Sequence, residues 1–117
     1  MAEKSYQWHL LALTATAIPW KPNQLAQVEV AGKTITLSLF EGQVSACAHK
    51  CPHSGGIMSE GFLDATGKIV CPLHRFKFDT RNGRNTSGEG YYLKTYPVEQ
   101  REEGLFIGIP ESSLFNW

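Results

Sequence analysis

Apolar residues recur at every second position in several stretches of this chain, and a turn signal separates each stretch from the next. The alternating positions are Val28, Val30, Ile35, Leu37, Leu39, Val44, Ala46, Ala48, Leu105, Ile107 and Ile109. Turns are expected at Gly32, at Glu41-Gly42 and at Glu103-Gly104. A strand with one buried face alternates in this way, so the pattern predicts antiparallel hairpins. We therefore expect an all-β fold, a sandwich or barrel scaffold that carries loops.

Length and charge narrow the class of protein further. The 117 residues are enough for a single domain over residues 1–117, and a chain that is 42% hydrophobic and 19% charged is globular. Eleven basic residues balance eleven acidic ones, which argues against a nucleic-acid partner because phosphate binding needs a net basic surface. No apolar run is long enough for a membrane span, so no membrane partner is expected.

The stretch from Leu10 to Ile18 resembles a targeting signal, because it is apolar and follows Lys4. Glu3 offsets that lysine, and polar residues interrupt the approach, so we interpret the stretch as a buried first strand. The chain has three cysteines, an odd number that does not suit a disulfide framework. Free thiols or metal ligands are typical of a reducing compartment, and a cytoplasmic location is expected.

The segment from about residue 46 to 84 interrupts the strand pattern and contains all three cysteines and three of the four histidines. Two clusters stand out within it, Cys51-Pro52-His53 and Cys71-Pro72-Leu73-His74, with seventeen residues between His53 and Cys71. Each cluster offers one thiolate and one imidazole. Strand patterns on both sides indicate a β scaffold whose loops carry the chemistry.

Two cysteines and two histidines can also bind a structural zinc ion. Zinc motifs usually place like ligands together, as in C-x2-C and H-x3-H, whereas each cluster here mixes one of each type. The mixed arrangement therefore argues against a zinc site. Cys47 lies four residues before Cys51 and is interpreted as a small buried strand residue rather than as a further ligand.

The spacing C-x-H-x17-C-x-x-H resembles that of the Rieske iron–sulfur family. Gly55-Gly56 after the first cluster, Phe78-Asp79 after the second and Trp8-His9-Leu10 near the start are similar to that family as well. The resemblance implies one [2Fe–2S] cluster per chain. It also implies that Cys51 and Cys71 bind the inner iron, while His53 and His74 bind the outer one. No catalytic residue is implied.

Several positions depart from the family's high-potential members. Gly56 and Leu73 occupy the places of two extra cysteines, and Phe76 and Phe78 occupy those of a serine and a tyrosine that donate to sulfur. These departures indicate the soluble, low-potential branch, similar to dioxygenase ferredoxin components and nitrite reductase small subunits. Arg75 replaces a common glycine. The run Gly88-Glu89-Gly90-Tyr91 stands in place of a Gly-Pro-Ala loop that covers the cluster in many relatives.

The resemblance implies a single-electron carrier rather than an enzyme, and three roles stay open. The first is a ferredoxin that passes electrons from a flavin reductase to an oxygenase. The second is the small subunit of an NAD(P)H-dependent nitrite reductase, and the third is an iron–sulfur assembly or sensing module. In each of the first two roles the partners are redox proteins.

Charge is distributed unevenly along the chain. Residues 50–84 contain six basic and three acidic residues, a formal charge of +3, and the rest of the chain carries −3. A positive segment that coincides with the cluster loops predicts docking of an acidic partner there. The alternative is that these are ordinary solvated loop charges.

Overall fold

The computed structural model describes residues 5–52, 55–73, 75–86 and 91–110. The strands are β1 (Tyr6–Ala12), β2 (Leu25–Val30), β3 (Lys33–Phe40), β4 (Gln43–Ala48), β5 (Phe62–Leu63), β6 (Ile69–Val70), β7 (Lys77–Phe78), β8 (Thr95–Tyr96), β9 (Val98–Arg101) and β10 (Gly104–Pro110). Two short 3-10 helices, η1 (Ala15–Ala17) and η2 (Met58–Glu60), complete the described elements. The expected all-β class is confirmed.

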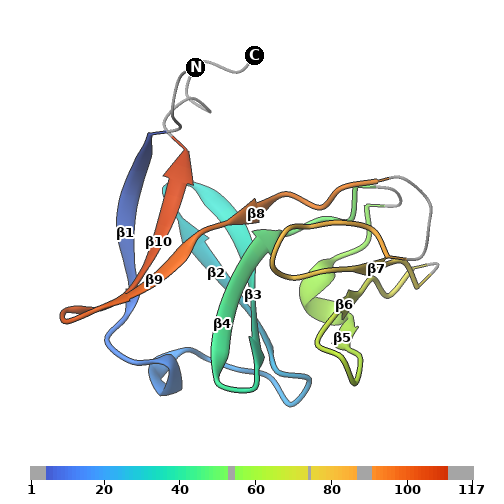
Figure 1. Ribbon diagram of the computed structural model, residues 1–117, viewed down its shortest axis with the longest axis horizontal. Coiled ribbons are helices and arrows are strands. Elements are labelled where there is room, and N and C mark those ends of the chain that lie inside the picture. The colour runs from blue at the N-terminus through green and yellow to red at the C-terminus, as the bar shows by residue number, and fades with distance from the viewer. Residues whose placement is uncertain (1–4, 53–54, 74, 87–90, 111–117) are drawn as a thin grey trace.

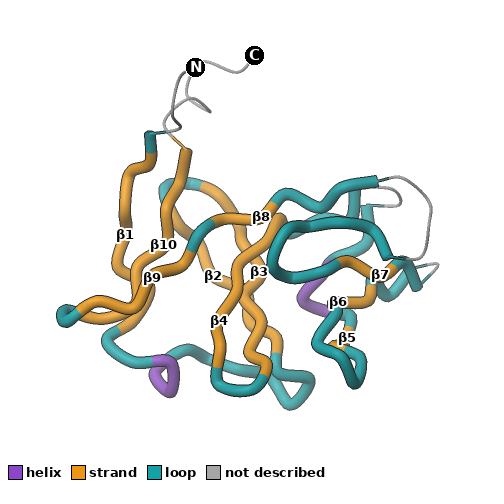
Figure 2. Tube along the Cα trace, in the orientation of Figure 1, coloured by secondary structure: helices purple, strands orange, loops and turns teal. Residues whose placement is uncertain are grey.

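The strands form three antiparallel sheets (Figure 1). One sheet has the order β1-β10-β9, the central sheet has the order β2-β3-β4-β8, and a small sheet has the order β5-β6-β7. The first two sheets pack against each other on one side of the molecule, and the small sheet lies on the other side with most of the loops (Figure 2). The strands in that second part have only two residues each, so loops dominate it.

The hairpins form where the alternation predicts them. β2 pairs with β3 from Leu25–Ser38 to Val30–Lys33, and β3 pairs with β4 from Ile35–Ala48 to Phe40–Gln43. Two-residue turns join them, and both residues of each turn have positive φ, as in the type I′ turns that suit the twist of a hairpin. The alternating positions are therefore in register across three neighbouring strands.

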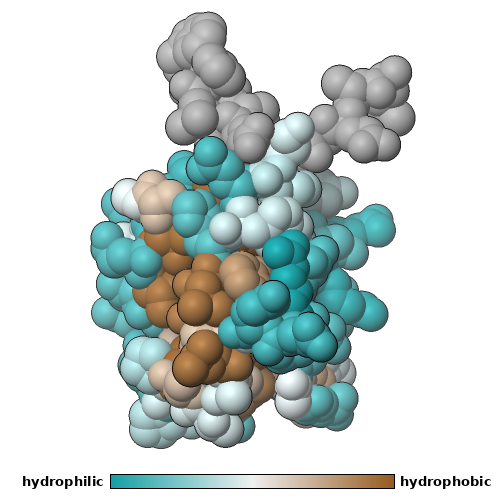
Figure 3. All heavy atoms as spheres, turned by 90° about the vertical axis from the view of Figure 1, so that its left-hand side faces the viewer, coloured by the Kyte–Doolittle hydropathy of each residue, from teal (hydrophilic) through white to brown (hydrophobic). Residues whose placement is uncertain are grey.

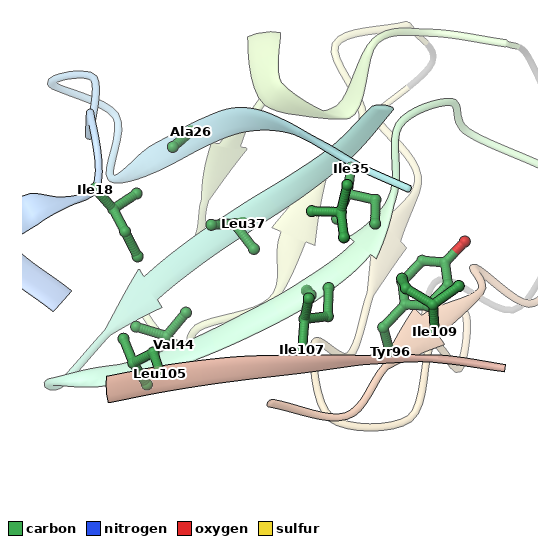
Figure 4. Packing of buried hydrophobic residues seen from close by; sticks show 11 residues of the cluster. Ile18, Ala26, Ile35, Leu37, Val44, Tyr96, Leu105, Ile107 and Ile109 are labelled. Carbon is green, nitrogen blue, oxygen red and sulfur yellow. The ribbon is translucent and has the colours of Figure 1, made fainter. Parts of the chain in front are cut away.

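The first core lies between the central sheet and the β1-β10-β9 sheet (Figure 4). It consists of Ile18, Ala26, Val30, Ile35, Leu37, Val44, Ala46, Tyr96, Leu105, Ile107 and Ile109. Ile35, Leu37 and Ile107 are completely buried. Burial of each such side chain stabilises the folded state by roughly 1.5–3 kcal/mol compared with leaving it exposed to water. This core is wholly apolar apart from the tyrosine hydroxyl, as expected for a scaffold.

The second core lies on the opposite face of the central sheet, under the loops. It contains Leu25, Cys47, Cys51, Met58, Ile69, Cys71, Phe78 and Leu93. Because β4 alternates, Ala46 enters the first core and Cys47 enters the second. All three cysteines of the chain are thus buried on the side of the sheet that carries the loops.

The first strand differs from the expectation. β1 begins at Tyr6 and ends at Ala12, and the chain then forms η1 instead of continuing as a strand to Ile18. Ile18 is buried, but Leu10 is 51% exposed and Leu13 is 69% exposed. Leu10 pairs with Phe106, whose neighbours Leu105 and Ile107 enter the first core, so this pair faces away from that core. Leu13 lies beyond the end of β1. Figure 3 shows a hydrophobic patch on this side of the molecule. In the described part of the chain, no helix is long and apolar enough to cross a membrane.

Candidate metal centre

Two loops of equal size carry the candidate ligands. The first runs from Cys51 to Gly56 and the second from Cys71 to Phe76, and in each the cysteine N–H donates to the carbonyl of the sixth residue at 2.8 Å. An antiparallel pair flanks each loop, Lys50–Ile57 for the first and Val70–Lys77 for the second. Each cysteine is therefore held at the base of a closed six-residue loop.

The two loops contact each other. A Cβ atom built on Gly56 would lie 2.7 Å from the Cys71 Sγ atom and 3.3 Å from the Leu73 Cγ atom. The first distance is shorter than carbon and sulfur atoms tolerate, so only glycine fits at this position. Gly56 of the first loop consequently packs directly on the cysteine of the second.

The fifth residue of each loop has a left-handed backbone. Gly55 has φ +73° and Arg75 has φ +57°. Glycine adopts this conformation without a steric penalty, whereas a residue with a side chain pays roughly 1–2 kcal/mol. Arg75, which replaces a glycine common in the family, thus adopts the backbone conformation that favours glycine.

Both cysteines are withdrawn from solvent, with Cys51 4% and Cys71 0% exposed. The prolines that follow them, Pro52 and Pro72, are exposed. His53 and His74 lie outside the described residues. Their places in the chain are the third residue of the first loop and the fourth residue of the second, beyond the buried cysteines along each loop.

Cys47 does not join this pair. It is a buried residue of β4, as expected, and burial raises the pKa of its thiol to about 12. A group of three cysteine, histidine or acidic side chains that could hold a metal ion is not found within the described ranges. A thiol of such high pKa stays protonated at neutral pH, which suits packing rather than ligation.

Acidic residues on the loop side of the molecule are tied to nearby loop atoms. Asp64 accepts hydrogen bonds from the Thr66 N–H and hydroxyl and from the Lys68 N–H, and it lies 3.5 Å from the Lys77 Nζ atom. Partial desolvation raises its pKa, but these hydrogen bonds outweigh that effect and hold the pKa at about 2. Asp64 therefore carries its charge at any physiological pH.

A second acid is paired in the same way. Hydrogen bonds from the Arg81 side chain and N–H hold the pKa of Asp79 below its usual range, and the Arg81 Nη2 atom lies 3.2 Å from the Asp79 Oδ2 atom. Lys50, Arg75 and Arg84 are exposed, and no ion pair is formed by them among the residues that the structure describes. The positive charge of this segment is thus displayed on the loops.

One contact next to the second loop has no counterpart in the sequence-based expectations. The Tyr91 ring stacks on the Phe76 ring, with centroids 6.1 Å apart and an interplanar angle of 29°. The only hint in the sequence is that a tyrosine follows the glycine-rich run that stands in place of the covering loop. Leu73, Tyr91 and Tyr92 are the exposed large apolar residues in this region.

Comparison with known proteins gives consistent matches. A family model described as "Rieske [2Fe-2S] domain" matches residues 8–97. The ferredoxin component of a naphthalene 1,2-dioxygenase system from Pseudomonas aeruginosa is 36% identical over 83 residues, which is 70% of this chain and 79% of that protein.

Solved structures show the same fold. The ferredoxin of carbazole 1,9a-dioxygenase from Nocardioides aromaticivorans superposes with a TM-score of 0.73 at 23% identity, covering 89% of this chain and 98% of the other. A protein named as an NADH-dependent nitrite reductase small subunit from Mycobacterium tuberculosis gives a TM-score of 0.74 at 21% identity, covering 90% and 96%.

The family model, together with two matched loops that are each closed at a buried cysteine, defines this chain as an iron–sulfur protein by class. It belongs to the Rieske [2Fe–2S] domain family, since the family model covers most of its length. Its cofactor is accordingly one [2Fe–2S] cluster. The donor types suit that cofactor, because two thiols buried at the bases of adjoining loops can supply the two sulfur ligands of a Rieske centre.

Proposed function

We propose that this protein is a one-electron carrier whose cluster is held by Cys51, His53, Cys71 and His74. The observation that carries the proposal is the pair of equal loops, each closed at a buried cysteine and packed together at Gly56. The two cysteines would hold one iron and the two histidines the other. Residues 1–117 would form a single domain, and its cluster-binding part would extend over about residues 46–84.

The residue types determine the chemistry that the cluster supplies, which is the uptake and release of one electron. With two thiolates and two neutral imidazoles, the oxidised centre has no net charge, whereas four thiolates would make it a dianion. Adding an electron to a neutral centre is easier, and Rieske potentials of roughly −150 to +300 mV accordingly exceed the value near −400 mV of plant-type ferredoxins. The chain's own contribution is to hold both cysteines in a dry, apolar core.

The partner we favour is an oxygenase, with a flavin reductase as the electron donor. The ferredoxin component from Pseudomonas aeruginosa supports this role, because its match extends over most of both chains. A second candidate is a nitrite reductase large subunit, which the structural similarity to the Mycobacterium tuberculosis protein supports at the level of fold. An assembly or sensing module is the third. The odd number of cysteines, which does not suit a disulfide framework, supports a cytoplasmic location.

The cofactor is tested on purified protein. A [2Fe–2S] centre with mixed ligands predicts a reddish-brown protein with two irons and two sulfides per chain and a rhombic EPR signal only after reduction. A colourless protein that contains zinc would contradict the proposal.

The partner is tested by mixing the reduced protein with a naphthalene dioxygenase oxygenase component or with a nitrite reductase large subunit. The favoured role predicts faster oxidation by the oxygenase.

Charge on the loops supplies a test of docking. Arg75 is exposed and directly follows His74, so a partner that approaches the histidines meets its side chain. We expect Arg75→Glu to slow association with the partner severalfold while iron content is unchanged, because a charge at the rim of an interface acts mainly on the association rate. Lys33→Glu, which lies at the start of β3 and outside the loops, is the matched control.

Stopped-flow rates over a range of ionic strength provide the measurement. Steering predicts that the wild-type rate falls as salt rises and that Arg75→Glu flattens this dependence. Rates that are independent of salt and equal in both variants would show that the loop charges are merely solvated.

A further inference from the structure

A short segment ties the second loop to the rest of the molecule. Residues Tyr91–Tyr96, here called the strap, pass from the loop region to the central sheet, and three of their side chains enter different environments. Tyr91 stacks on Phe76, Leu93 is buried in the second core with both loop cysteines, and Tyr96 is buried in the first core. The strap thus contacts each layer that supports the cluster loops.

Backbone contacts fix the strap in place. The Leu93 N–H donates to the Gly83 carbonyl at 2.8 Å, and Tyr92 forms an antiparallel bridge with Arg84. The two backbones are so close that a Cβ atom on Gly83 would overlap the Leu93 carbonyl. Farther along, the Ala48 N–H donates to the Lys94 carbonyl at 2.9 Å. The backbone that follows Tyr91 is therefore held by Gly83 and Arg84 on one side and by β4 on the other.

The ring that Tyr91 contacts belongs to the residue that closes the second loop. The Phe76 carbonyl accepts the Cys71 N–H, and the Phe76 side chain packs against the second core. Movement of Phe76 would open this hydrogen bond and expose the base of the loop. Stacking on one face by Tyr91 opposes that movement, and aromatic pairs in such arrangements add stability beyond the area that they bury.

We propose that Tyr91 is a positioning residue for the cluster: its ring clamps Phe76 and so keeps the second loop closed and water away from Cys71. This inference rests on the proposed function and adds a residue outside both loops to it. Cys71 is the ligand most affected, because Phe76 closes its loop. Phe76 has the bulky side chain that such a clamp needs, whereas the first loop closes at Gly56, which offers no ring to hold.

The strap provides its own matched control. Tyr91 and Tyr92 are adjacent and chemically identical, but Tyr91 is 39% exposed and stacked, while Tyr92 is 66% exposed. Tyr91→Ala removes the clamp, Tyr92→Ala removes an equal ring from the surface, and Tyr91→Phe keeps the ring without the hydroxyl. The three variants are compared in cluster-loaded, full-length protein.

Iron release to a chelator and the midpoint potential are measured together. We expect Tyr91→Ala to lose iron about fivefold faster than wild type, with Tyr91→Phe and Tyr92→Ala within twofold of it. Water admitted near the cluster stabilises the more negative reduced state, so the potential of Tyr91→Ala should also rise. A purely structural role would change thermal stability without a selective change in potential.

The outcomes separate this inference from the proposed function. A wild-type protein that holds no iron–sulfur cluster would overturn both. Wild-type protein with a normal cluster, and a Tyr91→Ala variant equal to it in release and potential, would overturn the clamp alone. Equal effects of Tyr91→Ala and Tyr92→Ala would overturn it too. If Tyr91→Ala does not accumulate as folded protein, Tyr91→Leu replaces it, and slow release from that variant would contradict an aromatic clamp.

Discussion

The two cysteine loops have the same length and the same closing hydrogen bond, yet they reach that geometry with different residues. The first loop uses Gly55 for the left-handed position and Gly56 for the close approach to Cys71. The second loop has Arg75 and Phe76 at the equivalent places. In the first loop, two glycines adopt this geometry without a steric penalty. In the second loop, Arg75 adopts the left-handed backbone despite its side chain, and the Tyr91 ring, from outside the loop, stacks on Phe76. Equal loop shapes can therefore have unequal margins of stability.

Removal of a cysteine from either loop is expected to have the largest effect on iron content. The effect should be the same for both loops, whatever the difference in their residues. Cys51→Ser and Cys71→Ser should both leave little or no iron, because a hydroxyl is a harder and far less acidic donor than a thiol. Cys47→Ser is the matched control, since it alters a buried cysteine outside the loops. It should lower the free energy of unfolding by about 1–3 kcal/mol yet keep the cluster.

Iron and sulfide analysis of the purified variants provides the measurement for the cysteine variants. A Cys51→Ser or Cys71→Ser protein with two irons per chain and an unchanged spectrum would remove that cysteine from the ligand set. The same analysis applies to His53→Ala and His74→Ala, for which a labile or absent cluster is expected.

The two glycines of the first loop sharpen the comparison. Gly56→Ala should impair cluster binding strongly, because its Cβ would lie 2.7 Å from the Cys71 Sγ atom. Gly55→Ala meets no atom within 4 Å, so its cost is the left-handed backbone alone, about 1 kcal/mol of stability with the cluster retained. EPR of the reduced variants together with urea unfolding distinguishes the two. Equal iron content in Gly56→Ala and Gly55→Ala would show that the loops separate readily.

The smallest expected effect is a gain in the second loop. Arg75→Gly should raise the free energy of unfolding by about 0.5–1 kcal/mol, because glycine relieves the strain at φ +57° and loses part of that gain to its flexibility when unfolded. Arg75→Ala removes the same charge without that relief and should show no gain. Urea midpoints with unchanged slopes provide the measurement. A gain in Arg75→Ala equal to that in Arg75→Gly would assign the effect to charge.

Four strands of the scaffold, β2, β3, β4 and β10, could be predicted from the sequence. The alternating positions of β2, β3, β4 and β10 lie in or against the first core, except Ala48 at the end of β4, which packs against the second core, because a period of two specifies both the strand and its buried side. Thus Ile35, Leu37 and Ile107, which the alternation places inward, are completely buried. The exposed side of β1 was not predicted, since an apolar run such as Leu10 to Leu13 carries no alternation that would identify its outer face.

The candidate site could be predicted in part. Its ligand types follow from the motif, and Cys51 and Cys71 are indeed brought to adjoining loops, whereas the assignment of all four ligands stays a prediction. The contact between Tyr91 and Phe76 was not predictable, because it joins segments fifteen positions apart through loops without a period. The two-residue strands β5, β6 and β7 are likewise too short to give an alternating signal.

The alternation along β4 limits how this chain can vary in evolution. Ala46 and Cys47 enter opposite cores, so an insertion or deletion of one residue within the strand would exchange the two faces. The scaffold core would then receive the thiol, and the layer beneath the loops would receive the smaller alanine. Changes in length should therefore be tolerated only at turns such as Glu102–Glu103 between β9 and β10, which leave both faces of the central sheet in phase. Related sequences that differ in length would be expected to differ there.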